Sequence, residues 1–167
     1  GGRIDAAARV HGNTVLFGGD IKYTGDTEES LYALGGDVDV DGRVGDDARI
    51  AGGQVTFGPA ADILGSVTVA GGRVDIEGKV SGDIRVAGGN VRLNGAVRGD
   101  VSVRAGQLEL GPDARIEGRL RYRTKDAPTI DSAATVAGGI ESRTERWYGR
   151  WMGSGSGVGG PSWFGLL

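Results

Sequence analysis

Residues 37–42 read Asp-Val-Asp-Val-Asp-Gly, a spacing of carboxylates that matches the opening of a calcium-binding EF-hand loop. Such a loop closes around its ion with a bidentate carboxylate at its twelfth position, and that position is Ala48 here. Val38 and Val40 alternate with the aspartates as buried residues alternate with exposed ones in a strand. Because a straight strand cannot wrap an ion, this run predicts a solvated acidic face and no metal site.

Three other patterns contain residue types that can do chemistry, but each lacks a feature that the chemistry requires. His11 is the single histidine, and we identify no second histidine or paired carboxylate in register with it. Asp83 and Asp100 could stand at one level, like the acids of a solenoid hydrolase, but both follow a glycine at corners that turn chemistry explains. Residues 155–160 satisfy GxGxxG, yet Pro161 stands where a dinucleotide site needs its helix. We therefore predict no enzyme activity, no cofactor and no small-molecule substrate.

The composition limits the remaining function classes. The chain has 167 residues, 38% of them hydrophobic, so it can bury a core, and its 34 glycines far exceed the usual share of about 7%. Cysteine is absent, which excludes disulfides and thiolate metal sites. A net charge of −3 argues against bulk polyanion binding, so we expect no nucleic-acid partner.

A 17-residue repeat organises most of the chain and accounts for the glycines. Its clearest form is the block Ala-Gly-Gly-x-Val-x-aliphatic-x-Gly at 70–78 and again at 87–95. Two-residue insertions at Gly58-Pro59 and Gly111-Pro112 shift the frame, and its regularity degrades after Tyr122. The apolar frame occupies positions 10, 14, 16, 21 and 23, and it starts again at 27, 44, 63, 80, 97 and 116.

The spacing within one repeat predicts strands that stack as coils. Successive apolar positions are separated by steps of 4, 2, 5, 2 and 4, which fits alternation in short strands and excludes the i, i+3, i+4 pattern of a helix. Three short segments with glycine corners describe a triangular coil, and coils stacked about 4.8 Å apart would form three parallel sheets. At the corners, glycine allows a positive φ or a close approach of neighbouring backbones. We predict an all-β, single-stranded parallel β-helix, a β-solenoid of roughly seven to eight triangular coils, over residues 1–142.

The VxGDVxV pattern and the turn length of this repeat resemble those of the bactofilin family. The resemblance rests on Val80–Gly89, which reads VSGDIRVAGG, on Val97–Val101, which reads VRGDV, and on Ile116–Leu120, which reads IEGRL. It covers residues 1–142 and implies a right-handed β-helical domain in a bacterial, polymer-forming cytoskeletal protein of the cytoplasm. It also implies nonpolar filaments, in which like ends join. Family members commonly have Pro-rich flanking segments, whereas this chain has four prolines and a Trp-rich tail.

The two ends of the solenoid are the expected contact surfaces. Residues 1–4 enter the repeat at once, so we expect the first coil to offer backbone donors and acceptors on which another copy can stack. The leading hypothesis is a structural, self-assembling scaffold protein that polymerises through its ends. Candidate interface residues are Ile4, Val10 and Leu16 at the N-terminal end and Ile116, Leu120, Tyr122, Val136 and Ile140 at the C-terminal end.

Charge is distributed unevenly along the chain. Residues 1–84 carry a net charge of −7, and residues 85–167 carry +4. The gradient can be chance variation on solvated surfaces, it can join unlike ends head to tail, or the basic end can lie on anionic lipid. Head-to-tail joining conflicts with the like-to-like joining that the resemblance implies, and the sequence does not decide between them.

The tail, residues 143–167, differs from the repeat in composition. Its aromatic and basic residues are typical of an interfacial membrane anchor, since aromatic rings prefer the headgroup level and arginine prefers phosphate. The same aromatic residues could instead fold back and cap the last coil, and a membrane segment after Leu167 would favour the anchor. We expect a bacterial membrane-associated protein, on the cytoplasmic or the exported side, with protein clients as further partners. The anchor candidates are Arg146, Trp147, Tyr148, Arg150, Trp151, Trp163 and Phe164.

A second hypothesis is a membrane-tethered, rod-like binding module of the cell envelope that does not polymerise. Such a rod would present one face to envelope polysaccharide or to a partner protein. Its mark would be a ladder of aromatic residues at 17-residue spacing on one outer face, and we identify none in the sequence.

Overall fold

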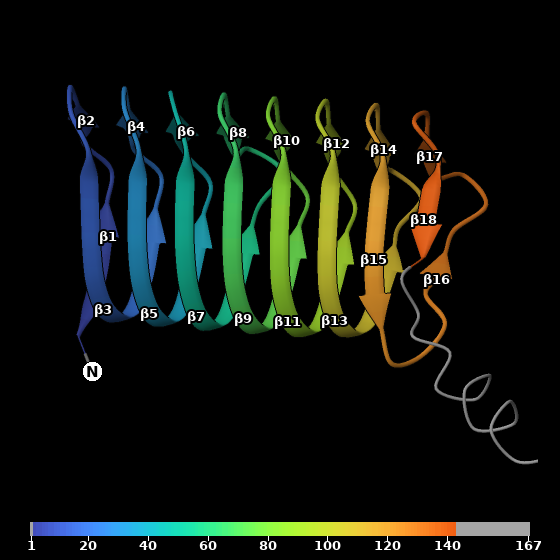
Figure 1. The fold of residues 1–167 in the computed structure, drawn as a ribbon. Helices are drawn as coiled ribbons and strands as arrows, with labels where there is room; N and C mark the ends of the chain where they lie inside the picture. Colours follow the sequence, from blue (N-terminus) through green and yellow to red (C-terminus); the bar gives the residue numbers. More distant parts are fainter. Residues whose placement is uncertain (1, 143–167) are drawn as a thin grey trace, which may run out of the picture.

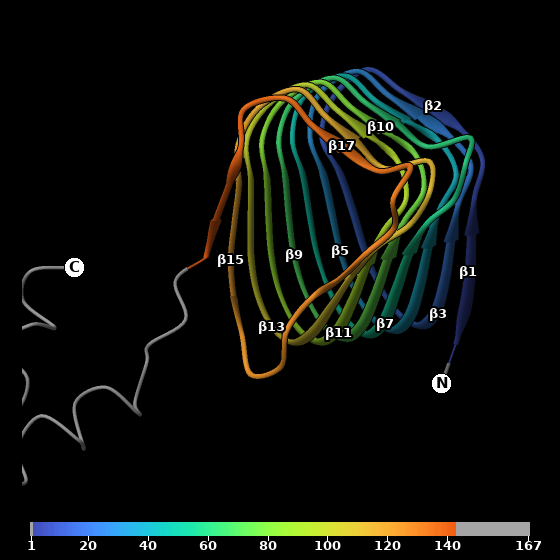
Figure 2. The same ribbon diagram turned by 90° about the vertical axis from the view of Figure 1, so that its right-hand side faces the viewer.

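The computed structural model describes residues 2–142, which form a rod of stacked coils (Figures 1 and 2). Within this range every element is a strand, and every strand pair is parallel. Each turn contributes one strand to an eight-stranded sheet, so the rod has about eight turns. The predicted parallel β-solenoid is confirmed.

Long and short strands alternate along the chain. The long strands have ten residues each, and the short strands, which form the opposite side of each coil, have two (Figure 2). The long strands are β3 (Thr14–Tyr23), β5 (Leu31–Val40), β7 (Ala48–Phe57), β9 (Val67–Ile76), β11 (Ile84–Leu93) and β13 (Val101–Leu110). The short strands are β2 (Arg9–Val10), β4 (Asp26–Thr27), β6 (Arg43–Val44), β8 (Asp62–Ile63), β10 (Lys79–Val80), β12 (Ala96–Val97), β14 (Arg115–Ile116) and β17 (Thr135–Val136). The end coils add β1 (Arg3–Ala6), β15 (Leu120–Thr124), β16 (Thr129–Ile130) and β18 (Ile140–Ser142).

The described coils form two hydrogen-bonded sheets where we predicted three. The reason is that each long strand continues through its Gly-Gly corner without ending, and so joins two sides of the coil. In the β11–β13 pair, Gly88 pairs with Ala105 and Asn90 pairs with Gln107, whereas Gly89 between them has no pairing partner. Each long strand therefore has a first half and a second half, which meet at the second glycine.

The inward positions predicted from the 17-residue frame form the core. From the second coil to Leu120 they are buried, with aliphatic residues in almost every place. The two predicted insertions lie at coil corners, and they lengthen the step by which Val44 pairs with Ile63 and Val97 pairs with Ile116. A third and larger extension follows in the last coil, where Ile116 pairs with Val136.

Close approach of the backbone, rather than a positive φ, explains the corner glycines. Among the described residues, only Gly139 has a positive φ. From the second coil onward the corner glycines are limited by space: a Cβ atom built on Gly78, for example, would lie 2.5 Å from the carbonyl oxygen of Ala61 in the preceding coil. Of the two reasons that the sequence suggested for glycine, contact between stacked coils is the one that applies at most of the described corners.

A buried hydrogen-bonded group interrupts the aliphatic core in the first two coils. The Tyr23 hydroxyl lies 2.6 Å from Thr27 Oγ1 and 3.1 Å from the backbone oxygen of Arg43, and these two acceptors share its single proton. Thr27 Oγ1 also lies 2.6 Å from Thr14 Oγ1. Tyr23 is 1% exposed and Thr27 is 0% exposed, so these bonds replace the water that both hydroxyls lose on folding.

Tyr23 should make stability sensitive to alkaline pH. Burial raises the pKa of Tyr23 above its ordinary value of 10.0. Above pH 10 the unfolded chain therefore releases the phenolic proton while the folded chain retains it, and the free energy of unfolding falls as pH rises. The substitution Tyr23→Phe removes this dependence, and it should cost about 1–2 kcal/mol at neutral pH because two acceptors lose their donor. Urea denaturation should show a gap between the two proteins that narrows above pH 10; a constant or widening gap would contradict this assignment.

Candidate assembly surfaces at the two ends

The N-terminal end of the rod exposes strand edges and core side chains. Strands β1 and β2 are the outermost strands of the two sheets, so no described residue pairs with their outer edges. The predicted interface residues Ile4, Val10 and Leu16 lie here and are half-buried. Their counterparts one coil further on, Ile21, Thr27 and Ala33, are at most 6% exposed. The first coil therefore leaves half covered the positions that the second coil buries.

The last coil corrects the predicted interface at the C-terminal end. Ile116 is 2% exposed and Leu120 is 0% exposed, because β17 and β18 stack on them. These two residues are therefore core residues and do not face the end. Tyr122 is half-buried beside β18, where it pairs with Ser142, and Val136 is half-buried in the last coil. The fifth candidate, Ile140, is 46% exposed, although it stacks directly on the fully buried Leu120.

Ile130 belongs to the same surface and was missed by the sequence analysis. It stacks on Leu110, which is 1% exposed, and is itself 39% exposed. The frame hides it because the last long strand is interrupted: β15 ends at Thr124 and β16 resumes at Thr129. Ile130 pairs with Leu110 over a longer step than the 17 residues of the regular repeat. The sequence does not reveal this step, because the repeat is irregular after Tyr122.

The charges on the contact coils differ from the average over each half of the chain. The first coil, residues 2–18, contains Arg3, Asp5 and Arg9 and has a net charge of +1. The last described coil, residues 125–142, contains one lysine and three acidic residues and has a net charge of −2. The first coil is therefore positive and the last described coil negative, the reverse of the charge gradient along the chain. In either case the two ends carry opposite charges and attract each other.

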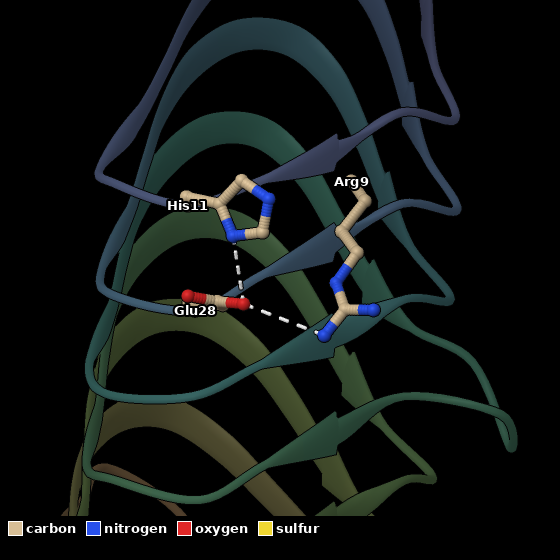
Figure 3. Close-up of polar contacts among 3 residues, drawn as sticks. All are labelled: Arg9, His11 and Glu28. Atoms are coloured by element: carbon tan, nitrogen blue, oxygen red, sulfur yellow. Dashed lines mark hydrogen bonds and ion pairs between the residues drawn. The ribbon is translucent and has the colours of Figure 1, made fainter.

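His11 has a carboxylate partner that the sequence analysis did not identify. Figure 3 shows Glu28 between His11 and Arg9, with Oε1 2.9 Å from His11 Nδ1 and 3.4 Å from Arg9 Nη2. Glu28 follows His11 by one full repeat, so the repeat itself was the signal that could have found it. The His11 side chain is 78% exposed, so this pair has no enclosed space that could hold a substrate. Its geometry supports a surface contact between coils 1 and 2, worth less than about 1 kcal/mol.

Asp83 and Asp100 are used as acceptors for backbone amides of the next coil. Asp83 Oδ1 accepts from the Asp100 amide at 2.7 Å, and Asp100 Oδ1 accepts from the Arg119 amide at 2.8 Å. Earlier corners repeat the arrangement, since the Ser66 amide donates to Asp47 Oδ1 at 2.8 Å. These carboxylates therefore tie corners of adjacent coils together, which gives them a structural role.

The aspartates of residues 37–42 lie on and after β5. Asp37 and Asp39 are exposed and point outward, whereas Val38 and Val40 are buried, as predicted. Across the β3–β5 pair, Asp39 stands opposite Lys22, so a cation shares this surface. Within residues 2–142, no group of three or more His, Cys, Asp or Glu side chains is arranged to hold a metal ion.

The predicted membrane anchor and the GxGxxG segment lie outside the described residues. Both belong to residues 143–167, so the anchor candidates between Arg146 and Phe164 remain predictions from composition. No helix in the part of the chain that the structure describes is long and apolar enough to cross a bilayer.

Comparison with known proteins gives one match. A family model described as bactofilin, polymer-forming cytoskeletal, matches residues 3–121, which is most of the coiled region. A search of the curated proteins and a search of the solved structures each found no match.

Proposed function

Because the chain belongs to the bactofilin family of polymer-forming cytoskeletal proteins, we propose that it builds a scaffold by stacking end to end, through the coil surfaces described above. The family is structural rather than enzymatic. End-to-end stacking requires no chemistry, because it uses strand-edge pairing and apolar burial, the interactions that already join neighbouring coils within one chain.

The exposure of core columns at the ends carries the proposal. Within the rod each inward column is buried, yet the same columns are uncovered where they reach the last coil, at Ile130 and Ile140. At the other end, the columns that begin with Ile4, Val10 and Leu16 are only half covered. A second copy stacked on either end would bury these side chains and pair the free strand edges, and both changes favour association.

We further propose that the polymer is associated with a bacterial membrane. Support comes from the aromatic and arginine residues of the tail, whose composition suits the headgroup region.

Negative-stain electron microscopy of the purified full chain across a salt series tests the polymer. We expect filaments at low salt with the width of a single rod. Filaments that dissolve as salt rises would assign the contact mainly to charge, because screening weakens exposed ion pairs, whereas filaments that persist would assign it to apolar stacking. Isolated short rods at every salt concentration would overturn end-to-end polymerisation and support the non-polymerising binding module.

A further inference from the structure

One outer face of the rod carries arginine and apolar residues and no acidic residue until its last coil. This face, here called the arginine face, consists of the outward positions in the first halves of the long strands. Two ladders run along it in register through β3, β5, β7, β9, β11, β13 and β15. One is Val15, Tyr32, Arg49, Thr68, Arg85, Ser102 and Arg121, and the other is Phe17, Leu34, Ala51, Ala70, Ala87, Arg104 and Arg123. The first acidic residue in either ladder is Glu141 of β18, which bonds to Arg121.

The N-terminal part of the arginine face is apolar. Val15, Phe17 and Leu34 are 56%, 67% and 52% exposed, and they lie on two adjacent strands, where Phe17 stands opposite Leu34. Next to them, the Arg49 guanidinium lies 5.8 Å from the centre of the Tyr32 ring. None of these side chains is required by the core, since outward positions elsewhere in the long strands are occupied mainly by polar and charged residues.

The C-terminal part of the arginine face is basic. Arg104, Arg121 and Arg123 line a shallow open cleft between β13 and β15, together with Ser102 and Tyr122. A guanidinium group matches the geometry of phosphate oxygens, which it binds through paired N–H donors.

The second halves of the long strands, by contrast, have mixed charge. With β1, which pairs with the second half of β3, their outward positions hold six acidic residues and four basic ones, namely Asp5, Asp20, Asp37, Asp39, Asp75 and Glu109 against Arg3, Lys22, Arg73 and Arg92. The two faces of the long strands therefore differ in charge, in addition to the charge difference along the rod axis. The arginine face is basic although the whole chain has a net charge of −3.

We propose that the arginine face lies on an anionic lipid bilayer. Phe17, Leu34 and Val15 would enter the boundary between headgroups and acyl chains, and the arginines of the later coils would contact lipid phosphates. The inference deepens the membrane association proposed above and rests on it, but it assigns the contact to the folded rod rather than to the tail. The face runs parallel to the rod axis, so both ends stay free and a filament can lie along the membrane.

Other partners fit the face less well. A nucleic acid would satisfy the arginines but would leave Val15, Phe17 and Leu34 against a charged backbone. The mixed-charge face of a second copy could pair with the arginines, but it would set the apolar residues against Asp37 and Asp39. A bilayer interface offers both anionic groups and an apolar layer at the required positions.

A pair of labels on one strand can test which face meets lipid. The chain has no cysteine, so Ala87→Cys and Asn90→Cys each create a single attachment site for a polarity-sensitive fluorophore. Both residues are exposed on β11, but Ala87 lies on the arginine face and Asn90 lies beyond the Gly-Gly corner. With phosphatidylglycerol vesicles, we expect a blue shift and brighter emission from the label at 87 and no change at 90. A response at 90 equal to that at 87, or silence at both positions while the protein sediments with vesicles, would overturn the proposal.

Charge reversal provides a second, matched test in the full chain. Arg85→Glu with Arg104→Glu should lower binding to phosphatidylglycerol vesicles by at least about tenfold, since each arginine near such a surface contributes roughly fivefold. The control Arg73→Glu with Arg92→Glu changes the net charge equally on the other face, and it should retain most of the binding. Equal loss in both variants, equal binding to phosphatidylcholine, or a label response to duplex DNA instead of vesicles would overturn the assignment. Electron microscopy of the parent chain and of both variants keeps polymerisation separate. A parent chain that forms filaments but does not bind the vesicles would overturn the membrane contact and leave end-to-end stacking standing.

Discussion

Filaments should disappear when a single carboxylate is placed on either end of the rod. In Leu16→Asp the charge lies on the first coil, and in Ile140→Asp it lies on the last described coil, where the native side chain is 46% exposed. Stacking a second copy would bury this carboxylate without a partner, which costs several kcal/mol and exceeds what one end contact can spare. Sedimentation velocity and negative-stain electron microscopy should both show the loss, while circular dichroism should show that the coils remain folded.

The matched control is Leu64→Asp, in the middle of the rod. Leu64 is 41% exposed, close to Ile140, but it lies at an outer corner that no stacked copy would cover. This variant should form filaments like the parent chain. The species left by the two end variants also reports filament polarity: dimers from each would mean that like ends join, and monomers from each would mean head-to-tail joining. Filaments of normal length from either end variant would contradict end-to-end assembly.

The core of the solenoid could be predicted from the sequence because the repeat fixes which residues share a column. Val74, Val91 and Leu108 recur at 17-residue steps, and all three are buried in adjacent long strands. Parallel stacking keeps each residue above its counterpart, so one correct frame gives the burial of every coil in which the step is constant.

The features that were missed depend on places where the step or the strand is not constant. The last coil is longer than the repeat, so the frame predicted Ile116 and Leu120 at the end together with Val136 and Ile140, whereas β17 and β18 of the last coil cover the first two. The corner at Gly88 and Gly89 was expected to separate two sheets, but hydrogen bonding resumes directly after it. Whether a glycine corner ends a strand or only bends it depends on backbone geometry that composition does not encode.

The surfaces were less predictable than the core, because outward positions change residue type from coil to coil, whereas inward positions stay mainly apolar. Counting charge along the chain gave an acidic half and a basic half, yet the sorting that matters for a flat partner runs across the rod. Val15, Tyr32 and Arg49 recur at 17-residue steps, so the repeat already places them in one outward ladder, and their pairing in β3, β5 and β7 shows that ladder. The search for an aromatic ladder missed this face because Phe17 and Tyr32 stand in different ladders, each followed by non-aromatic residues.

A single methyl group at Gly78 should destabilise the rod more than any surface change. Gly78 lies in a column with Gly25, Gly42 and Gly95, and in Gly78→Ala the new Cβ would lie 2.5 Å from Ala61 O and 2.8 Å from Ala61 Cβ. Both contacts involve the preceding coil, so relief requires two coils to move apart. We expect the free energy of unfolding to fall by about 2–3 kcal/mol, as for other overpacked sites.

The same column shows why the effect is specific to position rather than to residue type. Ala61 and Ala114 occupy the column in the two coils that carry Gly-Pro insertions, and both are fully buried. Each of those coils contains an added turn; in the first, the Ala61 amide donates to Gly58 O at 3.0 Å. The added turn makes room for an alanine methyl group, for which there is no space at position 78. Urea denaturation of Gly78→Ala should be compared with Gly12→Ala, whose new Cβ would have no neighbour within 4 Å and should change stability by less than about 0.5 kcal/mol. Equal stability of the two variants would mean that close packing between coils is not what restricts these corners to glycine.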